Sequence, residues 1–344
     1  MIAVQREGPW AAAVCVPVRN EAVLLPRLLD AIARQRGVSN FVLCLFFDAC
    51  SDDSVPIVAA RAGALPYPIV TAEAGQNGPA NAGLARLRAM ALGLSVLRED
   101  GIILSTDGDS EPGPDWLTAN IAALAHADVV AGRVVRTAVP TCAVQDRLEV
   151  YYDDLFALRR LIDPVPWEAA RTHHYTSGAS LGFRVDAYRL LGGFEPVPFA
   201  EDARLIDAAH RTGLRVRRDA TIRVETSSRR NGRAIGGLAD HLRNLDKEGP
   251  QATMSHPADE AWRYERHAAA RVAWHDLSGR RRSLAAMLGC IVGHVDRIAA
   301  DTQSAEAFVN CIVPEIPGGA RQVELDEAEQ ILANFFGSRQ GIAA

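Results

Sequence analysis

Short, fully apolar runs alternate with helical stripes over the first 130 residues, and this alternation limits the folds open to the chain. A short apolar run is typical of a buried strand, whereas apolar residues spaced three and four apart are typical of a helix. Strands that alternate with helices form a mostly parallel sheet covered on both faces, an α/β fold. The expected strands are 13–18, 41–47, 67–70, 101–106 and 128–135, and the expected helices are 22–35, 54–61, 79–97 and 116–126.

From residue 141 the pattern changes. Helices are expected at 142–161, 186–191 and 201–211, a strand at 177–184, and two short strands within 214–224. Beyond residue 235 glycines separate several helical stripes, the clearest of which spans 324–336. Its apolar stripe is wide enough to be buried, so we expect this helix to dock on the chain itself or on a second subunit of a homo-oligomer. We therefore expect a domain at 1–235, with a nucleotide half (1–130) and an acceptor half (131–235), followed by a helical extension at 236–344.

Asp107-Gly108-Asp109 directly follows the apolar strand expected at 101–106. Ligands of open α/β sheets bind at the carboxyl ends of strands. Two carboxylates this close repel each other unless a cation or hydrogen-bond donors lie between them. Mg²⁺ is often held by one or two carboxylates together with substrate phosphates. The motif thus indicates either a metal–diphosphate site or a solvated polar turn of the kind that ends many strands.

Three more polar clusters follow strands or open a helix. They are Pro17-Val-Arg-Asn-Glu21, Asp48-Ala-Cys-Ser-Asp-Asp-Ser54 and Glu201-Asp202. Because the carboxyl ends of parallel strands share one edge of the sheet, the first two clusters should lie beside Asp107 and Asp109. This convergence favours the metal–nucleotide interpretation over the polar turn.

In this order the motifs resemble those of the family 2 glycosyltransferases of GT-A fold. The resemblance covers roughly residues 12–232 and includes the segments 178–184 and 192–194, which match the acceptor side of that family. It implies transfer of a sugar from a nucleotide diphosphate sugar, such as a UDP- or GDP-sugar, to an acceptor hydroxyl. It also implies Mn²⁺ or Mg²⁺ as the cofactor.

The resemblance gives a role to each matching residue. Asp109 would bind the metal directly, with Asp107 between the metal and the ribose, and Asp202 would be the catalytic base. Segment 78–82 lacks the lysine or arginine often found there, which leaves a sugar or phosphate contact in doubt; Arg86 or Arg88 could take that place. The residues expected to contact the nucleotide are Pro17, Arg19, Glu21, Asp48 and Asp107.

The expected chemistry suits these side chains. Displacement of a nucleoside diphosphate builds negative charge on the leaving oxygen, which a divalent cation held by Asp109 would stabilise as a Lewis acid. A base such as Asp202 would take the proton of the acceptor hydroxyl, and such catalysis contributes about 10²–10⁴-fold. One displacement of this kind inverts the anomeric carbon.

Histidines and basic segments leave alternatives open. His174, next to His173, could complete the metal site, one of the two could contact the acceptor, or the pair could belong to a partly exposed loop. Segment 227–233 could close over the diphosphate through its arginines, or remain a solvated basic loop. Segment 279–282 could contact acidic lipid headgroups at a membrane surface, although a charge run at a helix start is the simpler interpretation.

Composition excludes several classes of protein. The net charge of −5 gives no basic signature of a nucleic-acid-binding protein. No hydrophobic region opens the chain as in a signal peptide, and the longest apolar stretch, at 284–295, is too short to span a bilayer. The six cysteines form no C-x-x-C pair, so we expect reduced thiols and a cytoplasmic protein.

Rival functions are separable by sequence features. A nucleotidyltransferase of related fold would usually carry a glycine- and arginine-rich phosphate loop after the first strand, where this chain has Arg19-Asn20-Glu21. A non-catalytic nucleotide-sugar-binding scaffold would be favoured by loss of Asp109 or Asp202, and both are present. A retaining transferase is a third alternative, which product stereochemistry would distinguish.

Overall fold

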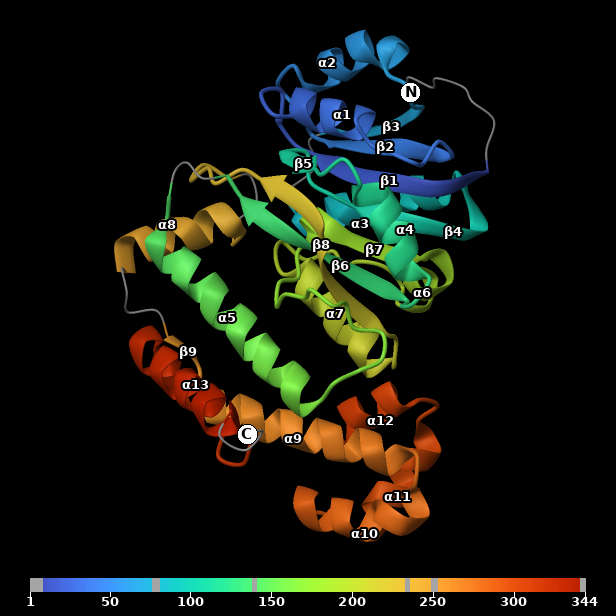
Figure 1. The fold of residues 1–344 in the computed structure, drawn as a ribbon. Helices are drawn as coiled ribbons and strands as arrows, with labels where there is room; N and C mark the ends of the chain where they lie inside the picture. Colours follow the sequence, from blue (N-terminus) through green and yellow to red (C-terminus); the bar gives the residue numbers. More distant parts are fainter. Residues whose placement is uncertain (1–8, 76–80, 138–140, 233–235, 249–252, 341–344) are drawn as a thin grey trace. The chain divides into compact units, whose positions relative to one another are not determined.

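The computed structural model describes residues 9–75, 81–137, 141–232, 236–248 and 253–340 (Figure 1). The chain divides into two compact units, each built from separate stretches of sequence. Unit 1 comprises Met1–Thr141, Ala169–Ala208 and Val216–Arg243, and unit 2 comprises Cys142–Glu168, Ala209–Arg215 and Asn244–Ala344.

Unit 1 is built on an eight-stranded sheet in the order β3-β2-β1-β4-β7-β6-β8-β5. The pairs β1–β2, β1–β4, β2–β3 and β6–β8 are parallel, whereas β7 runs antiparallel to both of its neighbours and β5 antiparallel to β8. The expected α/β fold with a mostly parallel sheet is therefore confirmed. The strands are β1 (Trp10–Val18), β2 (Phe41–Asp48), β3 (Ile69–Ala74), β4 (Leu97–Ser105), β5 (Ser110–Pro112), β6 (Val129–Arg136), β7 (Leu181–Arg184) and β8 (Val216–Thr226).

Helices cover both faces of this sheet because successive side chains of a buried strand point to opposite faces. On β1, Val14 and Val16 belong to one core cluster with Leu28 of α1 and Trp116 of α4. Cys15 points to the other face, where it lies against Gly93 of α3. The helices that begin in unit 1 are α1 (Leu25–Ala33), α2 (Ser54–Arg61), α3 (Ala82–Leu94), α4 (Trp116–Leu124), α6 (Val185–Leu190), α7 (Glu201–Arg211) and α8 (Leu238–Glu248).

Segment 214–224 corrects one expectation. Residues 216–224 belong to a single strand, β8, rather than to two short strands. The pairing with β6 shifts between Gly132, opposite Asp219, and Arg133, opposite Arg223. A Cβ at Gly132 would lie only 2.6 Å from the side chain of Ile222. Because Gly132 of β6 has no side chain, β8 can bulge toward it at this point.

Unit 2 is mainly helical, as expected for the C-terminal part, but it also contains α5 (Ala143–Ile162). The last helix buries Leu325, Ala328 and Leu332, and it packs within this unit on α5 and α9. The other elements are β9 (Thr253–Ser255), α9 (Pro257–Trp274), α10 (Leu277–Leu288), α11 (Val292–Asp301), α12 (Ala305–Ile312), β10 (Gln322–Glu324) and α13 (Leu325–Gln340).

The basic run at 279–282 lies in the first half of α10, where Arg280, Arg281 and Arg282 are exposed. The helix is capped by Asp276, whose carboxylate accepts from the Gly279 N–H at 3.2 Å. In the part of the chain that is described, no single helix is long and apolar enough to cross a membrane. Taken together, α10 and α11 reach that length and composition, but they are bent by 114°.

Candidate active site

A cavity of about 510 Å³ opens in unit 1 at the carboxyl ends of β1, β2 and β4. The starts of α3, α7 and α8 and the loops before η2 (Gly178–Ser180) and after β8 complete its wall. The expected convergence of the strand ends at one edge is therefore present. Seven of the eight predicted site residues line this cavity: Pro17, Arg19, Glu21, Asp48, Asp107, Asp109 and Asp202.

His174 is the predicted site residue that does not line the cavity. Its ring packs edge-on against the ring of Tyr175, with centroids 5.6 Å apart. His173 is buried; its Nε2 lies 3.1 Å from the Ala131 carbonyl oxygen, and its Nδ1 accepts from the Tyr175 N–H. Tyr175 and Thr176 line the cavity in their place.

Backbone strain is concentrated around the cavity. Among the described residues, the non-glycine residues with positive φ are Asn20 (55°), Ala49 (51°) and Ala200 (58°). Each stands next to a predicted site cluster: Asn20 between Arg19 and Glu21, Ala49 after Asp48, and Ala200 before Glu201. Such conformations persist only where the surrounding structure holds them, and they gather at functional sites.

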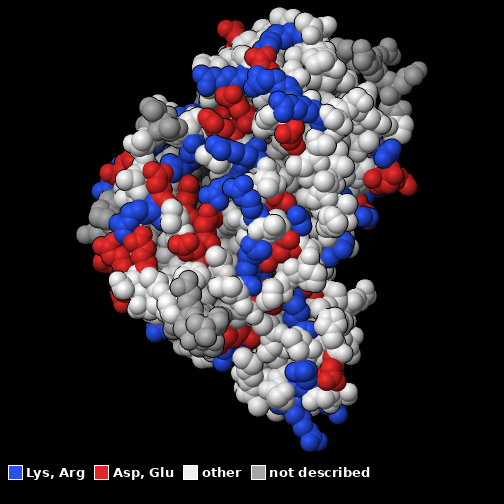
Figure 2. Space-filling model, viewed as in Figure 1, with Lys and Arg blue, Asp and Glu red and all other residues white. Residues whose placement is uncertain are grey.

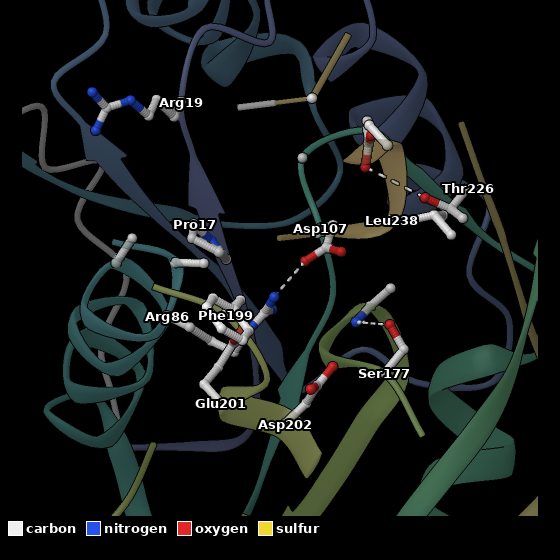
Figure 3. A pocket seen from close by; sticks show the side chains of 18 of the residues that line it. Pro17, Arg19, Arg86, Asp107, Ser177, Phe199, Glu201, Asp202, Thr226 and Leu238 are labelled. Carbon is white, nitrogen blue, oxygen red and sulfur yellow. Dashed lines mark hydrogen bonds and ion pairs between the residues drawn. The ribbon is translucent and has the colours of Figure 1, made fainter. Parts of the chain in front are cut away.

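The aspartates of the D-x-D motif are held by arginines. The Asp107 Oδ1 atom lies 2.9 Å from Arg86 Nη2 (Figure 3), and the Asp109 Oδ2 atom lies 3.0 Å from Arg229 Nη2. Arg229 also donates from Nη1 to Glu21 Oε2 at 2.7 Å. Burial and the negative charge of Asp107 raise the pKa of Asp109 to about 7, against the opposing charge of Arg229.

A divalent cation is compatible with this arrangement. Asp107 and Asp109 present oxygen atoms, the ligands that Mg²⁺ and Mn²⁺ prefer. Burial, and then the negative charge of Asp107, raise the pKa of Asp109, and a bound cation would offset both effects. Within the described residues no group of three His, Cys, Asp or Glu side chains could hold a metal ion. Substrate phosphates or water would therefore have to complete the coordination.

Glu201 and Asp202 open α7 but face different surroundings. Glu201 is buried, and its Oε1 accepts from Arg86 Nε at 3.0 Å. The Asp202 Oδ2 atom accepts from the Gly178 N–H at 2.8 Å and Oδ1 from the Ala203 N–H at 2.8 Å. These two donors fix the orientation of the Asp202 carboxylate at the cavity wall.

The cluster after β2 contains one residue that lines the cavity. Asp48 does so and accepts from Arg19 Nη1 at 2.8 Å. Asp52 is a turn residue: its carboxylate accepts from the backbone N–H groups of Ala22 and Ser54. Beside Asp48, a second cavity of about 300 Å³ is lined in part by Arg19 and Arg88.

Two predicted segments are described only in part. Residues 78–80 and residue 233 lie outside the described residues. Asn81 caps α3 by accepting from the Leu84 N–H at 2.8 Å. In the basic segment after β8, Ser227, Arg229 and Gly232 line the cavity.

Sequence patterns gave no signal for four further residues that line the cavity. They are Tyr175, Phe199, Leu238 and His241, and none belongs to a recognisable motif. Phe199 is 52% exposed, so its ring is accessible at the cavity. Figure 2 shows arginine and acidic side chains side by side over much of the face in view.

The family model for glycosyl transferase family 2 matches residues 13–148. The chain carries a family 2 glycosyltransferase domain. The resemblance stated from the motifs is thereby confirmed, together with the enzyme class. No curated protein matches the chain in sequence.

Three solved structures are similar to this chain. Mannosyltransferase PcManGT from Pyrobaculum calidifontis is 17% identical with a TM-score of 0.50, and the match covers 87% of this chain and 78% of that one. TarS from S. aureus is 16% identical with a TM-score of 0.45, covering 80% and 71%. Glucosyl-3-phosphoglycerate synthase from Mycobacterium tuberculosis is 17% identical with a TM-score of 0.43, covering 71% and 84%.

Proposed function

We propose that the protein transfers a sugar from a nucleotide diphosphate sugar to an acceptor hydroxyl, with inversion at the anomeric carbon. The observation that supports this most is the meeting of Asp107, Asp109 and Asp202 on one cavity of the glycosyltransferase domain. Pro17, Arg19 and Asp48 would contact the nucleoside. Tyr175, Phe199 and Leu238, which also line the cavity, would face the acceptor.

Mn²⁺ or Mg²⁺ is the proposed cofactor, with Asp109 as its direct ligand and Asp107 beside it. When bound, the ion would stabilise the negative charge of the departing diphosphate as a Lewis acid. Arg229 would supply further positive charge on the diphosphate side, since a guanidinium matches phosphate oxygens. The Pyrobaculum mannosyltransferase was solved with GDP-Man and Mn²⁺, and we propose the same class of donor here.

Asp202 is the proposed base. Its carboxylate is held by two backbone N–H groups, so it would meet the acceptor hydroxyl in a fixed orientation. A carboxylate can accept the hydroxyl proton as the oxygen attacks the anomeric carbon. The division into a nucleotide half at 1–130 and an acceptor half at 131–235 is part of this proposal. So is a cytoplasmic location, which suits six free cysteines.

Calorimetry with UDP- and GDP-sugars tests the donor and the metal together. We expect wild type to bind one of them with Mn²⁺ and much more weakly in chelator. Asp109→Asn should lose about tenfold or more of the Mn²⁺-dependent affinity, whereas Asp115→Asn, at an exposed helix start outside the cavity, should not. Equal binding by wild type in chelator would contradict the metal assignment.

Product analysis separates the rival reactions. A glycosyltransferase releases a nucleoside diphosphate, whereas a nucleotidyltransferase releases pyrophosphate. Binding of the donor without either product would favour the non-catalytic scaffold. The configuration of the new glycosidic bond, measured by NMR, distinguishes inversion from retention.

A further inference from the structure

Arg86 on α3 lies at the centre of a buried polar network. Its side chain is only 8% exposed. Four of its hydrogen-bond donor contacts reach three other segments of unit 1. Nη2 contacts Asp107 Oδ1 at 2.9 Å, Nε contacts Glu201 Oε1 at 3.0 Å, and Nη1 contacts Ser105 Oγ at 2.9 Å and the Gly178 carbonyl at 3.0 Å.

The network extends to Asp202 through one residue, Gly178. The carbonyl of Gly178 accepts from Arg86, and the N–H of Gly178 donates to Asp202 Oδ2 at 2.8 Å. A Cβ at residue 178 would lie 2.3 Å from the Arg86 Cζ atom, so only glycine allows this approach. Asp107 and Asp202 are thus joined by Arg86 and the backbone of one residue, Gly178, and Figure 3 shows the side chains of Arg86, Asp107 and Asp202 around the cavity.

Charge compensation alone does not require an arginine. A lysine would also balance the negative charges of Asp107 and Glu201. An ammonium group is a compact point charge, however, whereas guanidinium is a planar group whose donors are fixed relative to one another. The partners of Arg86 come from the end of β4, from η2 and from the start of α7, so the planar group fixes the relative positions of these three elements.

We propose that Arg86 is a positioning residue that sets the placement of the donor-side carboxylate, Asp107, relative to the base, Asp202. The inference rests on the proposed function. Arg86 acts through these two residues and does not itself react. Because a misplacement of about 1 Å between reacting groups can cost about 10²-fold in rate, a guanidinium that holds both sides affects turnover more than nucleotide binding.

Arg86→Lys is the primary test, because it keeps the charge and removes the planar fork. We expect turnover at saturating donor to fall about 10²-fold, while the affinity for the nucleoside diphosphate with Mn²⁺ changes severalfold at most. Hydrolysis of the donor should fall less than transfer, since water needs less accurate placement than the acceptor. Arg217→Lys is the matched control: Arg217 makes a similar ion pair with Asp219, at 2.9 Å, outside the cavity.

Ser105→Ala is a milder second variant for the case in which Arg86→Lys does not fold. It removes a hydroxyl that bonds both Arg86 and the Gly178 carbonyl. We expect a loss of about fivefold in transfer, the equivalent of one hydrogen bond, with the hydrolysis-to-transfer ratio raised in the same direction.

The outcomes separate the two proposals. If wild type transfers sugar and a folded Arg86→Lys, or Ser105→Ala in its place, keeps turnover and the hydrolysis-to-transfer ratio within twofold of wild type, the positioning role is wrong. The melting temperature of each variant is measured as well. If Arg86→Lys loses turnover only to the extent that it loses thermal stability, and Arg217→Lys shows the same relation, the role of Arg86 is structural and the inference is likewise wrong. If wild type transfers no sugar from any donor that it binds, the proposed function fails and this inference fails with it.

Discussion

Glu201 and Asp202 are adjacent in the sequence, yet their carboxylates meet different partners. The side chain of Glu201 is buried against Arg86, whereas Asp202 lies at the cavity wall and accepts only from backbone N–H groups in the contacts described above. The environment of each carboxylate therefore separates a structural residue from a candidate base. Sequence alone favoured Asp202 by its match to a family motif.

Asp202→Asn should leave donor binding nearly unchanged and lower transfer by about two to four orders of magnitude, because an amide cannot accept the proton. Donor affinity from calorimetry and turnover from product formation check this. Asp207→Asn, on an exposed position of the same helix, is the matched control. Near-normal turnover of Asp202→Asn would remove this residue as the base.

Phe199→Ala should raise the KM for the acceptor by about tenfold, because a half-exposed aromatic ring at the cavity would be covered by the acceptor. Donor affinity should not change. Leu190→Ala, at a 64% exposed position outside the cavity, serves as control. A loss of donor affinity without a change in acceptor KM would assign Phe199 to the nucleotide side.

Site residues differ in how far sequence could predict them. Asp107 and Asp109 were predictable because a single local pattern, an apolar strand that ends in carboxylates, carries the signal. Arg86 could be named only as a stand-in for a missing basic residue. Its partners Ser105, Gly178 and Glu201 are 19, 92 and 115 residues away, so only the folded chain shows its surroundings.

At the scale of elements, periodicity predicted long and regular segments best. Helix α2 and helix α7 have the expected bounds, since their apolar stripes and starts are local. Strand β5 is three residues long and exists through its pairing with β8, so no local pattern announced it. The sequence predicts two short strands where the structure has the single strand β8. The bulge that interrupts its pairing depends on Gly132 in another strand, so no local pattern predicts it.

Helix α9 carries a histidine that should make stability depend on pH. Burial, and then the positive charge of Arg263, lower the pKa of His267 to about 4. An unfolded chain would bind the proton near pH 6.5, so the folded state is favoured fully above that pH. This contribution, about 3 kcal/mol, is lost as the pH falls from about 6.5 to about 4.

His267→Gln should therefore flatten the decline in the free energy of unfolding between pH 7 and pH 4.5, measured by denaturant titration at each pH. His275→Gln, at the exposed end of the same helix, should leave the slope as in wild type. Asp109 acts in the opposite direction, since its raised pKa favours the folded state at acid pH. Comparing variant with wild type isolates the histidine. Parallel pH profiles for His267→Gln and wild type would show that His267 does not cause the decline.

At the scale of the whole molecule, all residues that line the larger cavity belong to unit 1. A bound donor stabilises what it contacts by mass action, about 2.7 kcal/mol at a hundred times its dissociation constant. Hydrogen exchange should consequently slow near residues 17–21, 81–86 and 105–109 when donor and Mn²⁺ are added. Amides of α10 to α12 should exchange as before; slowing confined to those helices would place the donor elsewhere.

The expected boundary at residue 235 is a division along the chain, whereas the compact units are divided by contacts. Hydropathy and glycine spacing report where helices begin and end, but not which helices pack together. Helix α5 lies within one residue of the helix expected at 142–161. Its membership of the C-terminal unit depends on α9 and α13, which begin at least 95 residues after the end of α5.

This threading of the chain limits how the protein can be shortened. A fragment that ends at Arg243 would retain every residue lining the cavity, together with α5. It would lack α9 and α13, on which α5 packs, and would expose Leu148, Tyr151, Leu155 and Leu158 to water. Such a fragment would contain a helix with an exposed apolar face and would be prone to aggregation. A soluble minimal enzyme therefore needs a short loop in place of residues 142–168 as well as a new C-terminus.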